Sequence, residues 1–159
     1  MPTPAQLFEK SARWPLGKAA FSRAVTWTAP YFASIAPRFT VLEPGKAEVR
    51  MKKRRSVLNH LGTVHAIAMC NLCELAAGTM LESSLARGQR WIPRGMSVRY
   101  LKKANTDLTA RTQVAPIAHD FVGDLVVHVD VLDASGEVVM DADIAMYISR
   151  AKPAAKRAA

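Results

Sequence analysis

Three polar side chains stand out in the segment 59–78, which reads NHLGTVHAIAMCNLCELAAG and is otherwise mostly apolar. They are Asn59, His65 and Glu74. A carboxylate in an apolar helix costs free energy unless it is hydrogen-bonded or used in chemistry, because burial disfavours its ionised form. Glu74 is therefore either a functional carboxylate suited to acid–base chemistry or a structural one that pairs with a basic side chain or reaches solvent, and both explanations stay open.

The segment from Gly62 to about Leu81 is rich in Ala, Leu, Met and Cys, which predicts a helix that is apolar nearly all round and therefore buried. On such a helix, His65 and Glu74 point to opposite sides and lie ~13 Å apart along the axis. They cannot meet within one chain, so a shared site needs Glu74 of a second chain in a two-fold dimer. The free backbone N–H groups at the helix start, notably that of Ala66, would then offer donors to a developing oxyanion.

Other elements must hold this helix in place. Residues 2–37 have a helical pattern broken by Pro and Gly, which predicts short helices packed on the rest of the chain. Pro44 and Gly45 mark a hairpin turn, whereas Gly88 and Pro93 predict a loop. Alternating polar and apolar residues predict strands at 39–41, 47–51, 96–100, 108–114, 125–132 and 138–148.

This order of elements predicts an α+β domain in which an antiparallel sheet of about six strands wraps around a long buried helix. We expect an N-terminal helical extension over residues 1–37, the main domain over 38–150 and a flexible basic tail over 151–159. The sheet keeps a free face or edge for a partner, so we expect a homodimer, and a tetramer of two such dimers stays open.

The spacing of the polar residues resembles a known motif. Asn59 lies six residues before His65, and Glu74 lies nine residues after it on the predicted helix. This pattern resembles the hotdog-fold thioesterases, in particular the phenylacetyl-CoA type, which carry Asn, His-Gly-Gly and Asp. The order of elements agrees with a hotdog fold over about residues 38–149, and stretches within 91–104 resemble a less studied thioesterase-like hotdog subgroup. The resemblance implies an acyl-CoA thioesterase.

The resemblance also implies a role for each site residue. Glu74 would act as general base on water or as nucleophile at the thioester carbonyl, and the Ala66 N–H of the other subunit would polarise that carbonyl. Asn59 would position the water or the carboxylate, and His65 would orient the loop. A leaving thiolate needs little protonation, so no metal and no cofactor is implied beyond the coenzyme A of the substrate. The basic residues expected to hold the coenzyme A phosphates are Arg94, Lys102 and Lys103.

Two departures from the family pattern open an alternative function. Ala66 and Ile67 stand where the family has two glycines, which keeps the N–H group but crowds the approach of a carbonyl. Glu74 stands where the phenylacetyl-CoA type has Asp, and its longer arm shifts the carboxylate by about one methylene. The alternative is therefore a hotdog domain that binds acyl-CoA or a partner protein without turnover.

The composition of the chain limits the classes of partner that we expect. The 159 residues include 22 Lys and Arg against 13 Asp and Glu, a net charge of +9 that attracts phosphate-bearing ligands, anionic membranes or nucleic acid. Aromatic residues make up only 7% and none is interleaved with basic runs such as 52–55, so we expect no nucleic-acid partner. No apolar run approaches the ~18 residues of a spanning helix, and we therefore expect no membrane insertion and a cytoplasmic protein.

Cys70 and Cys73 form a Cys-x-x-Cys pair that suggests a redox or zinc site. They lie in the middle of the predicted helix, whereas a redox pair opens a helix, and no second pair completes a zinc site. We interpret them as buried apolar side chains and predict no metal site. Outside this segment, His128 and Asp130 share a strand face and are expected to contact solvent or each other.

Overall fold

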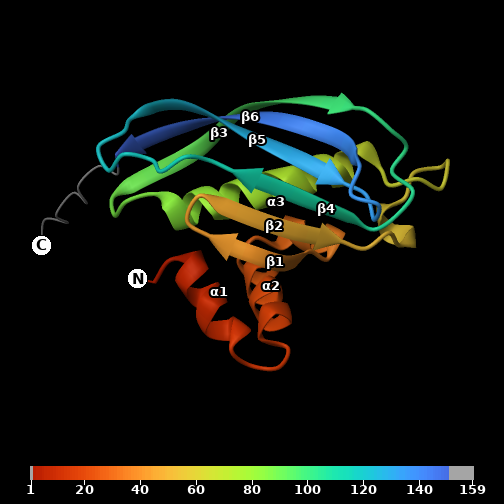
Figure 1. Cartoon of the computed structure of the whole chain (residues 1–159), viewed down its shortest axis with the longest axis horizontal. Helices are drawn as coiled ribbons and strands as arrows, with labels where there is room; N and C mark the ends of the chain where they lie inside the picture. The colour runs from red at the N-terminus through yellow and green to blue at the C-terminus, as the bar shows by residue number, and fades with distance from the viewer. Residues whose placement is uncertain (1, 151–159) are drawn as a thin grey trace, which may run out of the picture.

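The computed structural model describes residues 2–150, in which a curved sheet covers a central helix and two further helices pack below (Figure 1). The described chain contains α-helices (α), short 3-10 helices (η) and strands (β). In chain order they are α1 (Pro4–Ala12), α2 (Gly17–Thr28), η1 (Pro30–Ile35), β1 (Arg38–Glu43), β2 (Lys46–Met51), η2 (Arg55–Val57), α3 (Ala66–Ser84), β3 (Gln89–Tyr100), β4 (Leu108–Gln113), β5 (Gly123–Leu132) and β6 (Val138–Arg150).

The six strands form one antiparallel sheet in the order β1-β2-β4-β5-β6-β3. The sheet curves around α3, which is buried on nearly all sides, as Leu72, Leu75 and Met80 illustrate (Figure 1). On β6 the alternating apolar residues from Met140 to Ile148 face this core, since all of them are buried. The predicted α+β fold, with six strands around a long buried helix, is confirmed.

The central helix is shifted from its predicted boundaries. It runs over Ala66–Ser84 instead of 62–81, because residues 59–63 form a tight hydrogen-bonded loop before it. Gly62 in this loop has a φ of +76°, a conformation that a residue with a side chain adopts only at a cost. The shift leaves His65 at the N-cap of the helix, directly before its first turn.

The predicted loop at Pro93 is wrong, because Pro93 lies inside β3. The strand starts at Gln89, well before the first alternating residues. It forms an edge of the sheet, where a proline without an N–H group is tolerated, and its register against β6 shifts between Pro93 and Gly95. A proline argues against a central strand, but it does not argue against an edge strand.

The N-terminal helices join the core of the domain. Helices α1 and α2 lie below the sheet (Figure 1). Helix α1 packs against α3 and β1, and α2 packs against α1 and β1. The rings of Phe8 and Phe21 pack edge to face at 5.3 Å between centroids, and those of Phe21 and Phe39 at 5.4 Å. The short helices predicted for this region are confirmed, whereas the domain boundary after residue 37 stays a prediction. The predicted tail 151–159 lies outside the described residues.

The expected contact between His128 and Asp130 is confirmed on the outer face of the sheet. His128 Nε2 lies 3.2 Å from Asp130 Oδ1, and its Nδ1 lies 2.6 Å from Asp143 Oδ1. The hydrogen bond with Asp143 raises the pKa of His128 above its usual value. These groups satisfy one another on exposed strands, away from the helix that carries the candidate site residues.

Candidate active site

His65 closes the start of α3. Its backbone conformation is extended, and its Nδ1 accepts a hydrogen bond of 3.1 Å from the Ile67 N–H. Its carbonyl oxygen accepts from the N–H groups of Ala68 and Met69. His65 therefore holds the first turn in place, which agrees with the orienting role that the family resemblance implies.

Asn59 organises the loop before the helix. Its Oδ1 accepts from the backbone N–H groups of Leu61 and Thr63, at 3.0 and 3.2 Å, and its Nδ2 donates to Thr63 Oγ1 at 2.8 Å. The side-chain oxygen is thus already occupied within the chain. Only one N–H of the amide remains to act on a water or a carboxylate, so the implied role in positioning the water stays a prediction.

Replacing Asn59 with Ala is expected to lower the free energy of unfolding by about 1–3 kcal/mol, because three hydrogen bonds of a half-buried side chain are lost. Asn59→Asp is the matched control, since its carboxylate still accepts from both backbone N–H groups and from the Thr63 hydroxyl. Urea denaturation of both variants measures the effect. An alanine variant that is as stable as the wild type but inactive would contradict the loop role and favour water positioning.

The backbone N–H of Ala66 is the free donor at this helix start. The Ile67 N–H donates to the His65 ring, and the N–H groups of Ala68 and Met69 donate to the His65 carbonyl. The Ala66 N–H has no acceptor among residues 2–150. Ala66 is half-buried, and the neighbouring Ile67 side chain is 57% exposed. A free N–H at a helix N-terminus is a donor for a carbonyl oxygen that gains negative charge.

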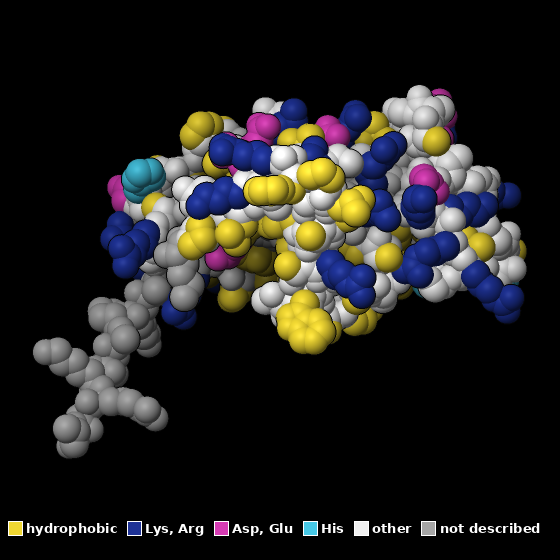
Figure 2. Space-filling model, turned by 90° about the horizontal axis from the view of Figure 1, so that it is seen from below, with side chains coloured by type: hydrophobic (Ala, Val, Ile, Leu, Met, Phe, Trp, Pro, Cys, Tyr) yellow, Lys and Arg dark blue, Asp and Glu magenta, His cyan; other side chains and the backbone are white. Residues whose placement is uncertain are grey.

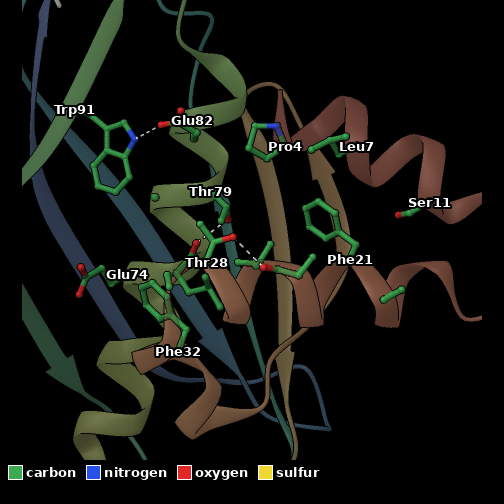
Figure 3. A pocket seen from close by; sticks show the side chains of 16 residues that line it. Pro4, Leu7, Ser11, Phe21, Thr28, Phe32, Glu74, Thr79, Glu82 and Trp91 are labelled. Atoms are coloured by element: carbon green, nitrogen blue, oxygen red, sulfur yellow. Dashed lines mark hydrogen bonds between the residues drawn. The ribbon is translucent and has the colours of Figure 1, made fainter. Parts of the chain in front are cut away.

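Glu74 lies halfway along α3, at the edge of a cavity of about 740 Å³ between α1, α2 and α3. Figure 3 shows its carboxylate pointing away from Phe21 and the apolar side of the cavity. The side chain is half-buried and has no hydrogen bond or ion pair with any residue of 2–150. The alternative that a basic side chain of the described chain neutralises Glu74 therefore finds no support. The other structural alternative, contact with solvent, fits the half-buried side chain and stays open.

His65 and Glu74 belong to different pockets of the single chain. His65 lines a smaller pocket of about 180 Å³ with Ser34, Ser56 and Asn71, and no residue lines both this pocket and the cavity at Glu74. This separation agrees with the helix geometry expected from the sequence. A site that uses both residues still needs a second chain, which remains a prediction.

Asn71 is a candidate that the sequence analysis missed. It is only 6% exposed, and its Nδ2 donates to Ser34 Oγ at 3.1 Å, but its Oδ1 has no partner within residues 2–150. An unpaired buried amide oxygen is costly unless a water or a ligand satisfies it. The burial argument applied to Glu74 would also have identified Asn71, whereas Ser34 comes from the distant η1 and carries no sequence signal.

The three predicted phosphate-binding residues differ in their surroundings. Arg94 pairs with Asp124 at 2.8 Å and stacks over the ring of Tyr147. Lys102 pairs with Glu137 at 2.8 Å. Lys103 is exposed and has no ion pair with another residue of 2–150. Its loop lies beside the start of α3, because the Val64 N–H donates to the Ala104 carbonyl at 2.9 Å. Lys103 is therefore the one of the three whose charge no described residue pairs, and its role in holding coenzyme A stays a prediction.

The interpretation as buried apolar side chains is confirmed for Cys73 but not for Cys70, which is half-buried and contacts a hydroxyl group. Both are free, and burial raises the pKa of the Cys73 thiol far above its usual value. Cys70 Sγ lies 3.5 Å from Tyr100 Oη, a contact that together with burial raises the pKa of Tyr100 to about 12.

Residues 2–150 contain no group of three or more His, Cys, Asp or Glu side chains arranged to hold a metal. None of the helices described here is long and apolar enough to cross a membrane.

Known structures share this architecture. A structural genomics target, APC5556, is 49% identical over 93% of this chain and 99% of its own, with a TM-score of 0.82. A Pseudomonas aeruginosa protein of unknown function, described as a probable thioesterase, is 20% identical over 86% of this chain and 97% of its own, with a TM-score of 0.75. A hypothetical thioesterase from Streptococcus pneumoniae, solved with coenzyme A, is 23% identical over 74% of this chain and 91% of its own, with a TM-score of 0.61.

These neighbours confirm the hotdog fold expected from the resemblance. Among curated proteins, none matches the chain. One family model, described as a domain of unknown function, matches residues 17–148 and so includes α2, the sheet and α3. The chain belongs to this family, DUF4442.

Proposed function

We propose that this protein hydrolyses an acyl-CoA thioester to the free acid and coenzyme A. The observation that carries the proposal is the half-buried carboxylate of Glu74, which has no partner within residues 2–150 and lies at the edge of a largely apolar cavity. A carboxylate that no ion pair occupies is free to take a proton from water, as a general base does. The coenzyme A bound to the pneumococcal thioesterase, a structure of the same fold, supports the choice of substrate.

The reaction needs two copies of the chain. The thioester carbonyl oxygen accepts from the Ala66 N–H of one copy, while Glu74 of the other copy takes a proton from water as the water oxygen attacks the carbonyl carbon. The tetrahedral intermediate collapses, the C–S bond breaks and the thiolate of coenzyme A leaves. The proton held by Glu74 passes to this thiolate, directly or through water, and the carboxylate is regenerated. Attack by the Glu74 carboxylate itself, followed by hydrolysis of the anhydride, gives the same products.

The sheet offers a place for the second copy. Strand β3 is an edge strand with free backbone groups, and its Ile92 is exposed. Pairing of two β3 strands would give a two-fold dimer and bring the α3 helices of both copies close to each other. The dimer, its assembly into a tetramer and a cytoplasmic location belong to this proposal, and the two free cysteines fit a reducing compartment.

A binding protein without turnover is the second candidate. One observation favours it: the Ile67 N–H donates to the His65 ring and is therefore not available to a thioester carbonyl. Within residues 2–150, only the Ala66 N–H stays free at the helix start, where the family motif has two glycines. In this case acyl-CoA would bind at the same helix start, but its carbonyl would be poorly polarised.

Release of free coenzyme A from short, long and aromatic acyl-CoAs tests the proposal. Thiol release in proportion to the amount of protein is expected for at least one substrate. The same panel is measured by calorimetry with acyl-CoA thioethers, which bind but cannot be hydrolysed. Binding without thiol release from any substrate would reject the thioesterase and support the second candidate. A panel with neither binding nor release would reject both.

A further inference from the structure

The N-terminal helices build most of the cavity beside Glu74. Figure 2 shows this face from below, with hydrophobic side chains gathered around a hollow and Lys and Arg side chains flanking them. The volume of about 740 Å³ falls within the ~300–1,000 Å³ typical of small-molecule sites. The apolar residues that line it are Pro4, Leu7, Ala20, Phe21, Ala24, Val25, Ala29, Phe32, Leu75 and Trp91.

The hydroxyl groups in the cavity wall offer no free donor. Ser11 Oγ donates to the Phe8 carbonyl at 2.8 Å, Thr28 Oγ1 to the Ala24 carbonyl at 3.1 Å and Thr79 Oγ1 to the Leu75 carbonyl at 2.7 Å. Each hydroxyl has a single hydrogen, so each is used within its own helix. The wall therefore favours an apolar guest, and a polar group on that guest would lose its hydrogen bonds with water.

Trp91 forms a fixed wall of the cavity on the side of β3. Its Nε1 donates to Glu82 Oε2 at 2.9 Å, as Figure 3 shows. Its ring lies against Gly78 of α3, where an added Cβ would be 2.7 Å from the Trp91 ring. Glycine at this position thus allows the indole ring to approach the helix closely.

We propose that this cavity holds the acyl chain of the thioester, and that α1 and α2 determine which chains are accepted. The inference rests on the proposed function and adds the substrate class: an alkyl or aryl acyl group without polar substituents. Glu74 lies at the edge of the cavity with its carboxylate pointing away from the apolar side. A chain that fills the apolar side and ends at this edge would leave its thioester carbonyl on the side of the carboxylate. Residues 2–37, the N-terminal extension, thereby become part of the binding site.

The test compares Ala24→Phe with the wild type on straight-chain acyl-CoAs from short to long. Ala24 lines the cavity and is exposed, so the larger ring fills space without disturbing the core. The ratio of kcat/KM for the longest chain to that for the shortest is expected to fall by at least ~10-fold, since each methylene in an apolar pocket contributes ~10-fold or more. Ala12→Phe is the matched control, because Ala12 is exposed on α1 and does not line the cavity.

A second variant acts in the opposite direction. Trp91→Ala removes a wall, and the ratio of kcat/KM for the longest chain to that for the shortest is expected to rise.

Binding of acyl-CoA thioethers separates failure of this inference from failure of the proposed function. If no substrate is hydrolysed but affinity still depends on chain length and Ala24→Phe weakens only the long chains, the cavity inference stands and the thioesterase fails.

Two results would overturn the inference. The first is a chain-length profile of Ala24→Phe that equals that of Ala12→Phe, in both hydrolysis and binding. The second is a change in oligomeric state of Ala24→Phe, measured by light scattering, without a change in the profile. That outcome would mean that the cavity is covered by a second copy of the chain and not by the acyl group.

Discussion

Replacing Glu74 with Gln is expected to lower acyl-CoA turnover by about 10²–10⁴-fold, the range over which a positioned acid–base group contributes to a rate. Gln has nearly the same size and shape but cannot take a proton from water. Because Glu74 has no ion pair within residues 2–150, the substitution breaks no structural contact there, and the melting temperature should change little. Thiol release and thermal unfolding measure the two effects on the same protein.

Glu9→Gln is the control for the loss of one negative charge. Glu9 is exposed on α1, and its bond with Arg13 at 3.0 Å can be kept by the Gln side chain. Affinity for acyl-CoA thioethers should be kept in Glu74→Gln, since Gln has nearly the same size and shape as Glu. A Glu74→Gln variant with wild-type turnover would exclude Glu74 as base or nucleophile.

Much of the fold could be predicted because its main signals are local. The alternating residues of 125–132 and 138–148 indicate strands with one buried face, and the chain buries that face in the structure. The segment that became α3 lacks a polar face, which is typical of a helix enclosed by other elements. Pro93 was misinterpreted because the position of β3 at the sheet edge depends on strand pairing, which no local pattern encodes.

The candidate site was only partly predictable. The burial argument singles out Glu74, and the spacing to Asn59 and Glu74 singles out His65. Both stay candidates, and helix geometry correctly placed them in separate parts of one chain. The loop contacts of Asn59 and the orphan oxygen of Asn71 depend on distances between atoms. The cavity arises where α1 and α2 pack against α3, and sequence patterns of the separate helices do not reveal such a space.

The Ala66 N–H can be removed by a single substitution at the first residue of α3, and this allows a second strong test. Ala66→Pro deletes the N–H group and is expected to lower turnover by about 10²–10³-fold, as measured for other donors to an oxyanion. The backbone should tolerate the change. Ala66 is the first residue of α3, a position where proline is common, and its own N–H is not needed by the helix.

The residue before the substitution is also compatible with proline. His65 has a φ of −66° and a ψ of 137°, the extended conformation that proline requires of its predecessor. Ala66→Gly is the matched control, because it keeps the N–H and restores the first glycine of the family motif; its turnover should equal or exceed that of the wild type. The rates are compared with circular dichroism of both variants. A folded Ala66→Pro protein with wild-type turnover would show that this N–H does not polarise the thioester, and the reaction would then need another donor at the helix start.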